Sequence, residues 1–235
     1  MFYSHSFSAS ILMCSRTLTQ VPLIDFPSLK RALEILHIDY QVPNVVISSI
    51  PLYPWLIPIL PSAIKPSDSS TPHLLCVSSQ VTGDRNSDHI SIVSAACVPH
   101  IPGYFSGVGD LFSALLLGHY NPQIPYGNAV VQNDGIALTN DDSLGDKASA
   151  DPLRSATSFA LSVTHAILSF THARTLSLPD DQRPPTDDEL DAAEPLRLTR
   201  RMRGRELALV QGRHLITDKD AAPRYELLPW TDFWA

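Results

Sequence analysis

The sequence Gly103-Tyr-Phe-Ser-Gly-Val-Gly-Asp110 runs directly into the apolar stretch Leu111-Phe-Ser-Ala-Leu-Leu-Leu117. The glycines at positions 107 and 109 allow a tight backbone turn, with positive φ where it is needed. We predict that a helix begins at or near Asp110, so that its unpaired amides and the positive end of its dipole form an anion site. A carboxylate there would repel phosphate. Its expected role is therefore to take a proton from an attacking hydroxyl, or to orient that hydroxyl. The stretch therefore points to phosphoryl transfer.

The Gly-x-Gly-Asp pattern has a second interpretation when it is taken alone. Two glycines and an aspartate also suit an ordinary helix N-terminus, where the carboxylate favours the positive end of the dipole, and the pattern by itself favours this interpretation. It is not a dinucleotide-binding fingerprint, because the third glycine and the preceding spacing do not fit, and it lacks the Gly-Lys-Ser/Thr ending of a Walker A loop. The rest of the chain must therefore decide between the two.

Helical and strand patterns alternate on both sides of the glycine turn, which predicts an α/β fold. The signal Asp25-Phe-Pro-Ser28 marks a helix start, and residues 51–70 form a loop rich in proline and serine. The predicted elements are a helix over 29–40, strands over 44–49, 73–78 and 89–95, the helix after the glycine turn, a helix over 152–171, and a short helix over 205–212. The core face predicted for the helix over 152–171 consists of Leu153, Ala156, Ala160, Val163, Ile167 and Phe170.

Composition and charge limit the class of protein. The chain has 235 residues, of which 44% are hydrophobic and 17% charged, as in a globular domain. A formal net charge of -7 argues against a nucleic-acid or anionic-membrane partner. The most apolar window, residues 44–64, is interrupted by four prolines, which favours a buried strand and a loop over a membrane span. Cys14, Cys76 and Cys97 are far apart and have no metal-ligand spacing, which indicates reduced thiols in an intracellular compartment.

The stretch Tyr104–Leu117 resembles the signature of the pyridoxal kinases, members of the ribokinase-like superfamily, in which a strand ends in a glycine turn followed by a DLFxALLL-type helix. Other segments resemble the same family in the same order, and the resemblance covers roughly residue 19 to the C-terminus. It implies a partial ribokinase-like three-layer α/β fold over residues 19–235, with a central β-sheet flanked by helices and a solvated linker over 176–193. The other matching segments are 32–37, 44–52, 73–80 and 205–216.

The resemblance assigns roles to particular residues. The turn aspartate of such kinases is the base for the 5′-hydroxymethyl group of the substrate, and here it is Asp110. The family often has threonine where this chain has Val108, so one side-chain contact to the nucleotide is lost while the backbone anion hole is kept. Ser48 and Ser49 match the nucleotide-contacting pair, although serines at a strand end also hydrogen bond to their own turn. The implied anion hole is Gly107, Val108 and Gly109, and the implied nucleotide-binding residues are Ser48, Ser49, Phe105 and Ser106.

The resemblance also implies an activity and its partners. The activity is ATP-dependent phosphorylation of pyridoxal, pyridoxine and pyridoxamine, which yields pyridoxal 5′-phosphate and related vitamers. ATP, Mg²⁺, a monovalent cation, a homodimer and a cytoplasmic or nuclear location are implied, with no nucleic-acid or membrane partner. The sequence shows no ligand set for either metal. His165 and His172 lie two helical turns apart, too far to share a metal, which favours packing or surface roles.

The N-terminal segment departs from the family. The family has a Thr-Pro-Asn-x-x-Glu segment that organises the phosphates and magnesium, and the matching place here reads Ile11-Leu-Met-Cys-Ser-Arg-Thr17. We therefore expect residues 1–18 to be an unrelated or disordered segment. We also expect the N-terminal half of the family's fold, with most of its vitamin-binding pocket, to be missing. A sheet of about three strands would then be left half-exposed.

Three hypotheses follow from these observations. In the first, the chain is a pyridoxal kinase with Asp110 as its base. In the second, it is a truncated, catalytically dead fragment that binds nucleotide or dimerises as an interaction module, because binding and positioning supply much of a kinase's rate. In the third, it is another ribokinase-like small-molecule kinase, acting on a sugar or a hydroxymethylpyrimidine. The segment Arg205–Gln211 and the strand end at Ser48–Pro51 favour the pyridoxal kinases.

Overall fold

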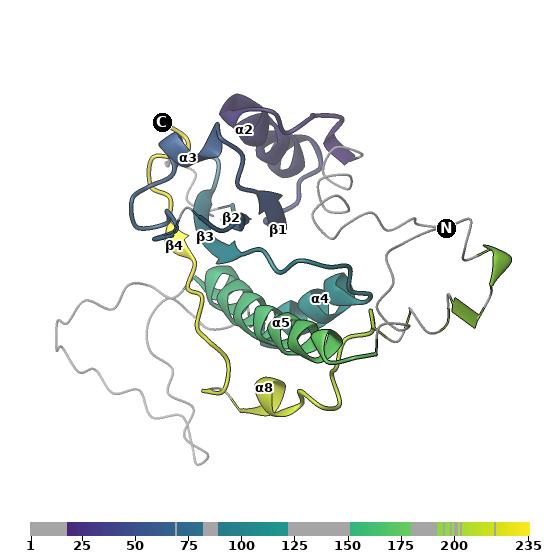
Figure 1. Cartoon of the computed structure of the whole chain (residues 1–235). Coiled ribbons are helices and arrows are strands. Elements are labelled where there is room, and N and C mark those ends of the chain that lie inside the picture. The colour runs from purple at the N-terminus through teal and green to yellow at the C-terminus, as the bar shows by residue number, and fades with distance from the viewer. Residues whose placement is uncertain are drawn as a thin grey trace, which may run out of the picture.

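The computed structural model describes residues 18–68, 70–81, 89–121, 151–179, 192–194, 196, 197, 199, 202, 204–218 and 220–235. They form three layers, a central sheet with helices on both faces (Figure 1). The strands are β1 (Asn44–Pro51), β2 (His73–Gln80), β3 (Ile92–Pro99) and β4 (Leu228–Pro229). The helices are α2 (Phe26–Glu34), the π-helical η1 (Ile35–Asp39), α3 (Leu56–Ile59), α4 (Val108–His119), α5 (Pro152–Leu176) and α8 (His214–Thr217).

Helix α2 begins where the sequence predicts a helix start. The Asp25 carboxylate accepts a hydrogen bond from the Ser28 amide at 2.9 Å, and the Ser28 hydroxyl oxygen accepts one from the Asp25 amide at 3.1 Å. This capping box satisfies two amides that the first turn leaves without intrahelical partners. Leu29 and Leu33, one turn apart, are fully buried against the sheet. The predicted helix over 29–40 is thus confirmed, with its last turn wound as the π-helix η1.

The four strands are antiparallel and lie in the order β1-β2-β3-β4. A register shift between Ile47 and Ile50 makes a bulge at the serine pair 48–49 of β1. The predicted strands over 44–49 and 73–78 are confirmed. The strand predicted over 89–95 is displaced, because β3 starts at Ile92 and runs on to Pro99. Ser91 lies just before it and uses its hydroxyl to bond Ser79, and the pairing with β2 continues to Pro99 opposite His73.

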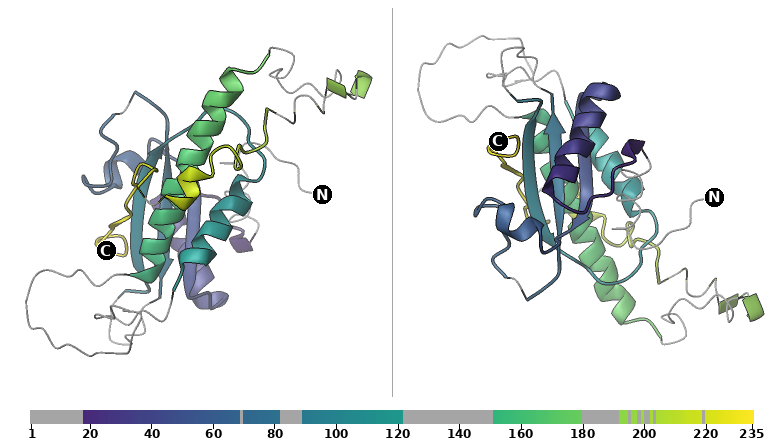
Figure 2. Two further views of the ribbon diagram at one scale, coloured as in Figure 1. Left: turned by 90° about the horizontal axis from the view of Figure 1, so that it is seen from below. Right: turned by 90° about the horizontal axis from the view of Figure 1, so that it is seen from above.

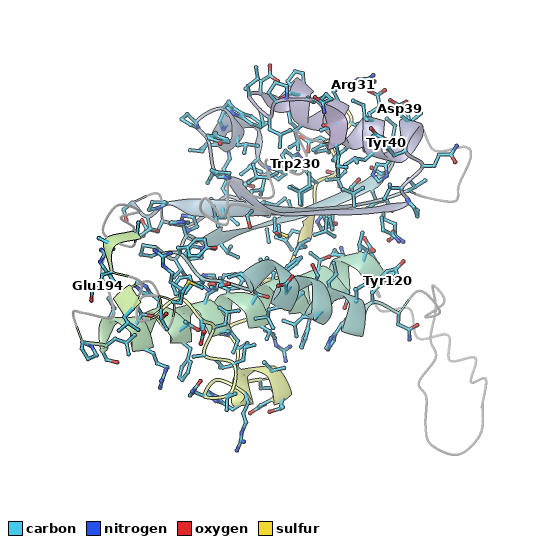
Figure 3. All side chains as sticks on the ribbon, turned by 90° about the vertical axis from the view of Figure 1, so that its right-hand side faces the viewer. Arg31, Asp39, Tyr40, Tyr120, Glu194 and Trp230 are labelled. Atoms are coloured by element: carbon cyan, nitrogen blue, oxygen red, sulfur yellow. The ribbon has the colours of Figure 1, made fainter. Side chains whose placement is uncertain are left out.

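Both faces of the sheet are covered, so the expected half-exposed sheet is wrong. Alternate residues of β2 point to opposite sides: Leu75 and Val77 join the core under α2, and Cys76 joins the core under α4 and α5. The C-terminal segment closes the first core with Trp230 and Phe233, which pack edge to face at a centroid distance of 5.0 Å. Figure 3 shows Trp230 between the α2 layer and the sheet, and Figure 2 shows α4 beside α5 on the other face.

The short helix predicted over 205–212 is wrong. The segment forms turns and one isolated bridge, and the nearest helix is the four-residue α8 at His214–Thr217. Its backbone bonds elsewhere: the Ala208 amide donates to the Thr171 hydroxyl oxygen of α5 at 3.1 Å. Gly212 packs so closely on α5 that an added Cβ would lie 2.9 Å from the Ile167 side chain. The segment is therefore held in turns by contacts with α5, and one turn closes with a hydrogen bond from the Gly212 amide to the Ala208 carbonyl at 2.8 Å.

Helix α5 confirms the predicted helix over 152–171 and extends it to Leu176. The Asp151 carboxylate caps its start by accepting from the amides of Leu153 and Arg154. Much of the predicted linker over 176–193 and all of residues 1–17 lie outside the described residues, and the domain limits 1–18 and 19–235 stay predictions. In the described part of the chain, no helix is both long and apolar enough to cross a membrane.

A chain of buried hydrogen bonds ties η1 to the sheet and to the C-terminal segment. His37 Nδ1 lies 2.7 Å from the Val42 carbonyl oxygen, and Nε2 lies 2.7 Å from the Ser79 hydroxyl oxygen. Ser79 bonds Ser91 at 2.7 Å, and the Trp234 indole N–H donates to the Ser91 carbonyl at 2.9 Å. The neutral imidazole with its proton on Nδ1 satisfies this arrangement, because Nε2 then accepts from the Ser79 hydroxyl. Burial lowers the pKa of His37 from its ordinary value of 6.5, and the hydrogen bond to Val42 opposes this only in part.

This lowered pKa predicts acid destabilisation. Burial also lowers the pKa of His165. The unfolded chain binds these protons more readily than the folded chain, so the free energy of unfolding falls as the pH drops through about 6.5 toward the lower folded-state pKa values. We expect the melting temperature to fall from about pH 7 to pH 5, and to fall less steeply in His37→Gln. If the melting temperature falls with pH as steeply in His37→Gln as in a variant of the exposed His214, the role given to His37 is contradicted.

Candidate active site

The glycine turn has the backbone conformation that the sequence predicts. Gly107 is the N-cap of α4 and has a φ of +82°, in the left-handed region that favours glycine. Helix α4 begins at Val108, and its first closing hydrogen bond runs from the Leu111 amide to the Gly107 carbonyl at 3.0 Å. The amides of Val108, Gly109 and Asp110 precede that bond and have no partner within the helix. Three donors and the positive end of the dipole therefore face the turn.

The space in front of the turn is open. A Cβ added at Gly107 or at Gly109 would meet no atom within 4 Å. Asp110 is exposed and occupies the first turn of α4. An anion of phosphate size can therefore approach the first-turn amides without displacing a described side chain, and the carboxylate of Asp110 lies on the solvent side where a second substrate has access.

The C-terminal segment holds the turn in place. The Ser106 amide donates to the Arg205 carbonyl at 2.8 Å, and Ser106 forms a parallel bridge with Glu206. The guanidinium of Arg205 lies over the ring of Tyr104, with Cζ 5.0 Å from the ring centroid. The Thr175 hydroxyl of α5 lies between two carbonyl oxygens, 3.0 Å from that of Thr171 and 3.1 Å from that of Gly204, where the same segment meets the helix layer. The segment that does not form a helix thus acts as a brace for the glycine turn.

A pocket of about 60 Å³ lies beside the turn and joins residues from distant parts of the sequence. Ser48 and Ser49 reach it from the bulge of β1, and Phe105 and Val108 reach it from the turn. Both serines are buried, and their hydroxyl oxygens lie 3.4 Å apart. Four predicted site residues therefore line one cavity. Ser106 is exposed, is not among the lining residues, and contributes its backbone to the brace.

The pocket and Asp110 lie on different sides of the first turn of α4. Val108 and Phe112, one turn apart, face the pocket. Because an α-helix advances by about 100° per residue, Asp110 points away from that side, with the first-turn amides between the two. A nucleotide base in the pocket and a second substrate at Asp110 would thus meet at the amides. The arrangement suits transfer of a phosphoryl group from one side to the other.

Sequence reasoning missed the wall of the pocket that α5 supplies. The predicted core face of α5 packs elsewhere, and a second stripe of Leu161, Thr164, His165 and Leu168 lines the pocket. This stripe also follows helical spacing, but it mixes polar with apolar residues, so apolar periodicity does not reveal it. His165 lies 3.1 Å from the Pro99 carbonyl oxygen and packs edge to face on Tyr225, and His172 packs on Phe105. The predicted packing roles of both histidines are confirmed.

The described residues hold no cluster of three His, Cys, Asp or Glu side chains that suits a metal ion, so the sites for Mg²⁺ and a monovalent cation stay unassigned. Cys76 and Cys97 are free thiols, as predicted. Burial raises the pKa of Cys76 to about 12 and that of Cys97 to about 11, which makes both poor nucleophiles at neutral pH. The third cysteine, Cys14, lies outside the described residues.

Comparison with known proteins identifies the fold. No model of a known protein family matches the chain, and no curated protein matches it. Among solved structures, the pyridoxal kinase from Leishmania donovani in complex with ADP and pyridoxine matches 93% of this chain, with a TM-score of 0.51 and 19% identity. The same kinase in complex with ADP matches 93% of the chain, with a TM-score of 0.52 and 18% identity. The chain has a partial ribokinase-like fold, which it shares with these pyridoxal kinase structures.

The match covers only part of those structures. This chain spans 50% of the length of the L. donovani kinase in both complexes. An identity below 20% shows the fold and does not by itself carry activity or substrate. The function of this chain must therefore be argued from its own site.

Proposed function

We propose that this chain is a phosphotransferase of the pyridoxal kinase type, which binds ATP at the glycine turn and transfers its terminal phosphoryl group to a hydroxymethyl group. The observation that carries the proposal is the junction of three features at the start of α4: the open first-turn amides, the pocket that contains Ser48 and Ser49, and Asp110 on the opposite side. Each feature alone occurs in proteins of other function, and their arrangement around one turn is what favours phosphoryl transfer.

The proposed chemistry uses these groups in order. The amides of Val108, Gly109 and Asp110 hold the phosphate oxygens and stabilise the charge of the transferring group. The Asp110 carboxylate takes the proton of the acceptor hydroxyl as the oxygen attacks the terminal phosphorus. The bond from that phosphorus to the bridging oxygen breaks, and ADP leaves.

The choice of acceptor rests on likeness, not on a pocket seen in this chain. The L. donovani kinase has been solved with ADP together with pyridoxine, and also with ADP together with pyridoxamine. The sequence around the glycine turn resembles pyridoxal kinases over Tyr104–Leu117. The structural match to the L. donovani kinase covers 93% of the chain. We therefore propose vitamin B6 vitamers as the acceptors, with a sugar or a hydroxymethylpyrimidine as the alternative substrate class.

The test is product formation by the purified chain from ATP and each candidate acceptor. We expect phosphorylated pyridoxal, pyridoxine or pyridoxamine in preference to phosphorylated sugar or hydroxymethylpyrimidine. The rate should be roughly 1 s⁻¹ or less, below the 1–100 s⁻¹ that is typical of kinases. Positioning of the acceptor supplies much of a kinase's rate, and no acceptor pocket is seen among the described residues. Preferential phosphorylation of another acceptor would overturn the substrate assignment.

A second function rests on the same turn and pocket, because open first-turn amides beside a lined cavity suit nucleotide binding even without phosphoryl transfer. It is a non-catalytic module that binds nucleotide through the same turn and pocket. A folded chain that binds ADP but forms no product with any acceptor would favour it. A folded chain that binds no adenine nucleotide would remove the support for both functions.

A further inference from the structure

The hydroxyl groups of α5 follow a pattern that Thr164 breaks. The other buried or half-buried side-chain hydroxyls of this helix donate to the backbone carbonyl four residues earlier, a common way for such a hydroxyl to be satisfied in a helix. Thr157 bonds Leu153 in this way at 2.6 Å, and Thr171 bonds Ile167 at 2.7 Å. The residues that show the pattern are Thr157, Ser158, Ser162, Thr171 and Thr175. Among the described residues, Thr164 Oγ1 has no hydrogen-bond partner of any kind.

Thr164 lies in the wall of the pocket. Its exposed fraction is only 4%, so water outside the molecule does not satisfy its hydroxyl. The other buried side-chain atoms left without a partner in the described part, Asn44 Oδ1 and Ser94 Oγ, belong to residues that do not line this cavity. A buried hydroxyl without a partner is costly, so a side chain that forgoes the available carbonyl of its own helix calls for a partner in the cavity.

The rest of the lining defines the chemistry of that partner. Leu74, Val98, Leu161 and Phe112 give the pocket apolar walls, while Ser48, Ser49 and His165 add a few polar groups. The Pro99 carbonyl accepts from His165 Nε2, so in the neutral form that burial favours the proton lies on that nitrogen. Apolar walls with a few polar groups among them suit a heteroaromatic ring that has both donors and acceptors.

We infer that Thr164 hydrogen bonds to the polar edge of the nucleotide base, and so contributes to the affinity for the base rather than for the phosphates. The inference rests on the proposed nucleotide site, because the pocket adjoins the first-turn amides through Val108. The hydroxyl can either donate or accept, which lets it pair with a ring nitrogen or with an exocyclic amino group. A bound water molecule is the competing partner, since the cavity has more room than one water needs.

The test compares Thr164→Val with Thr157→Val by calorimetric titration of ADP and of inorganic pyrophosphate. Thr157 is a matched control, because it is fully buried in the same helix, satisfies its hydroxyl at Leu153, and does not line the pocket. A neutral hydrogen bond corresponds to a change of roughly threefold to tenfold in affinity. We expect Thr164→Val to lower the affinity for ADP by that factor and to leave the affinity for pyrophosphate unchanged. Thr157→Val should leave both unchanged, and Thr164→Ser should restore ADP binding.

Each contrary outcome has a separate meaning. Equal ADP affinity in wild type and Thr164→Val overturns the inference and assigns the hydroxyl to water, while the proposed nucleotide site stands. Equal losses for ADP and pyrophosphate, or an equal loss in Thr157→Val, overturn it as well, because the effect is then not directed at the base. A wild-type chain that binds pyrophosphate but not ADP overturns it together with the base pocket. Failure to bind either probe overturns the proposed function itself.

Discussion

Asp110→Asn is expected to lower the rate of pyridoxal phosphorylation by roughly a hundredfold to ten-thousandfold, which is the usual contribution of a general base. The amide keeps the size and the hydrogen-bonding capacity of the side chain but cannot take the proton of the hydroxyl. Affinity for ADP should stay the same or rise, because the carboxylate points away from the pocket and repels phosphate. The measurement is the initial rate of product formation, together with calorimetric binding of ADP.

Glu206→Gln is the matched control for Asp110. Glu206 is an exposed acid beside the same turn, and its backbone bridges Ser106. Its replacement should change the rate by no more than about twofold, since a lone surface charge contributes little. A large loss of rate in Glu206→Gln, with none in Asp110→Asn, would assign the general base to Glu206 instead of Asp110. A wild-type rate in both variants would contradict general-base catalysis by a carboxylate at this turn.

Gly109→Ala is expected to separate stability from binding. Gly109 lies in the first turn of α4 without a positive φ, so alanine fits the backbone and raises helix propensity by up to about 1 kcal/mol. The added methyl group enters the open space in front of the amides, where the phosphate would lie. Loss of one hydrogen bond to a charged group corresponds to roughly a tenfold to hundredfold weaker affinity for ADP. Calorimetric titration and thermal unfolding measure the two effects.

Gly118→Ala tests whether that loss comes from the position and not from the substitution. Gly118 lies near the other end of the same helix, and a Cβ there also meets no atom within 4 Å. It should leave ADP binding unchanged. Wild-type affinity in Gly109→Ala would show that phosphate does not contact these amides.

Local signals in the sequence predicted most of the elements that position the site. Asp25 and Ser28 mark the start of α2 because a capping box needs only residues three apart. Gly107 and Gly109 predicted the turn and the start of α4, since positive φ at Gly107 is a property of the local backbone. The positions of β1 and β2 in the chain followed from short apolar runs, which are rich in β-branched residues only in β1.

The elements that sequence reasoning missed depend on contacts between distant residues. The segment after Arg205 has a helix-like composition, but Ser106 and Thr171 take its hydrogen bonds, and neither partner is visible from the segment itself. The coverage of the sheet by Trp230 and Phe233 depends on the chain returning over β3. Local pattern carries no signal for such returns.

In the candidate site, too, some residues were predicted from the sequence and others were found only in the structure. Resemblance assigned Ser48, Ser49 and Phe105 to the nucleotide and Val108 to the anion hole. All four line one pocket, although their roles stay predictions. Thr164 was not assigned, because the sequence does not show which of the hydroxyls in this helix has a hydrogen-bond partner. The structure shows that the Thr164 hydroxyl has none among the described residues.

The central claim is that a nucleotide binds at the start of α4, and the most direct measurement is an ADP titration of the isotopically labelled chain followed by amide and methyl NMR. The largest chemical-shift changes should fall on the amides of Val108, Gly109 and Asp110 and on the methyl group of Thr164. Saturable shifts confined to the separate surface cavity between α5 and Ala222–Glu226, which is lined by Arg154 and Arg224, would contradict it. So would a folded chain whose spectrum does not respond to ADP.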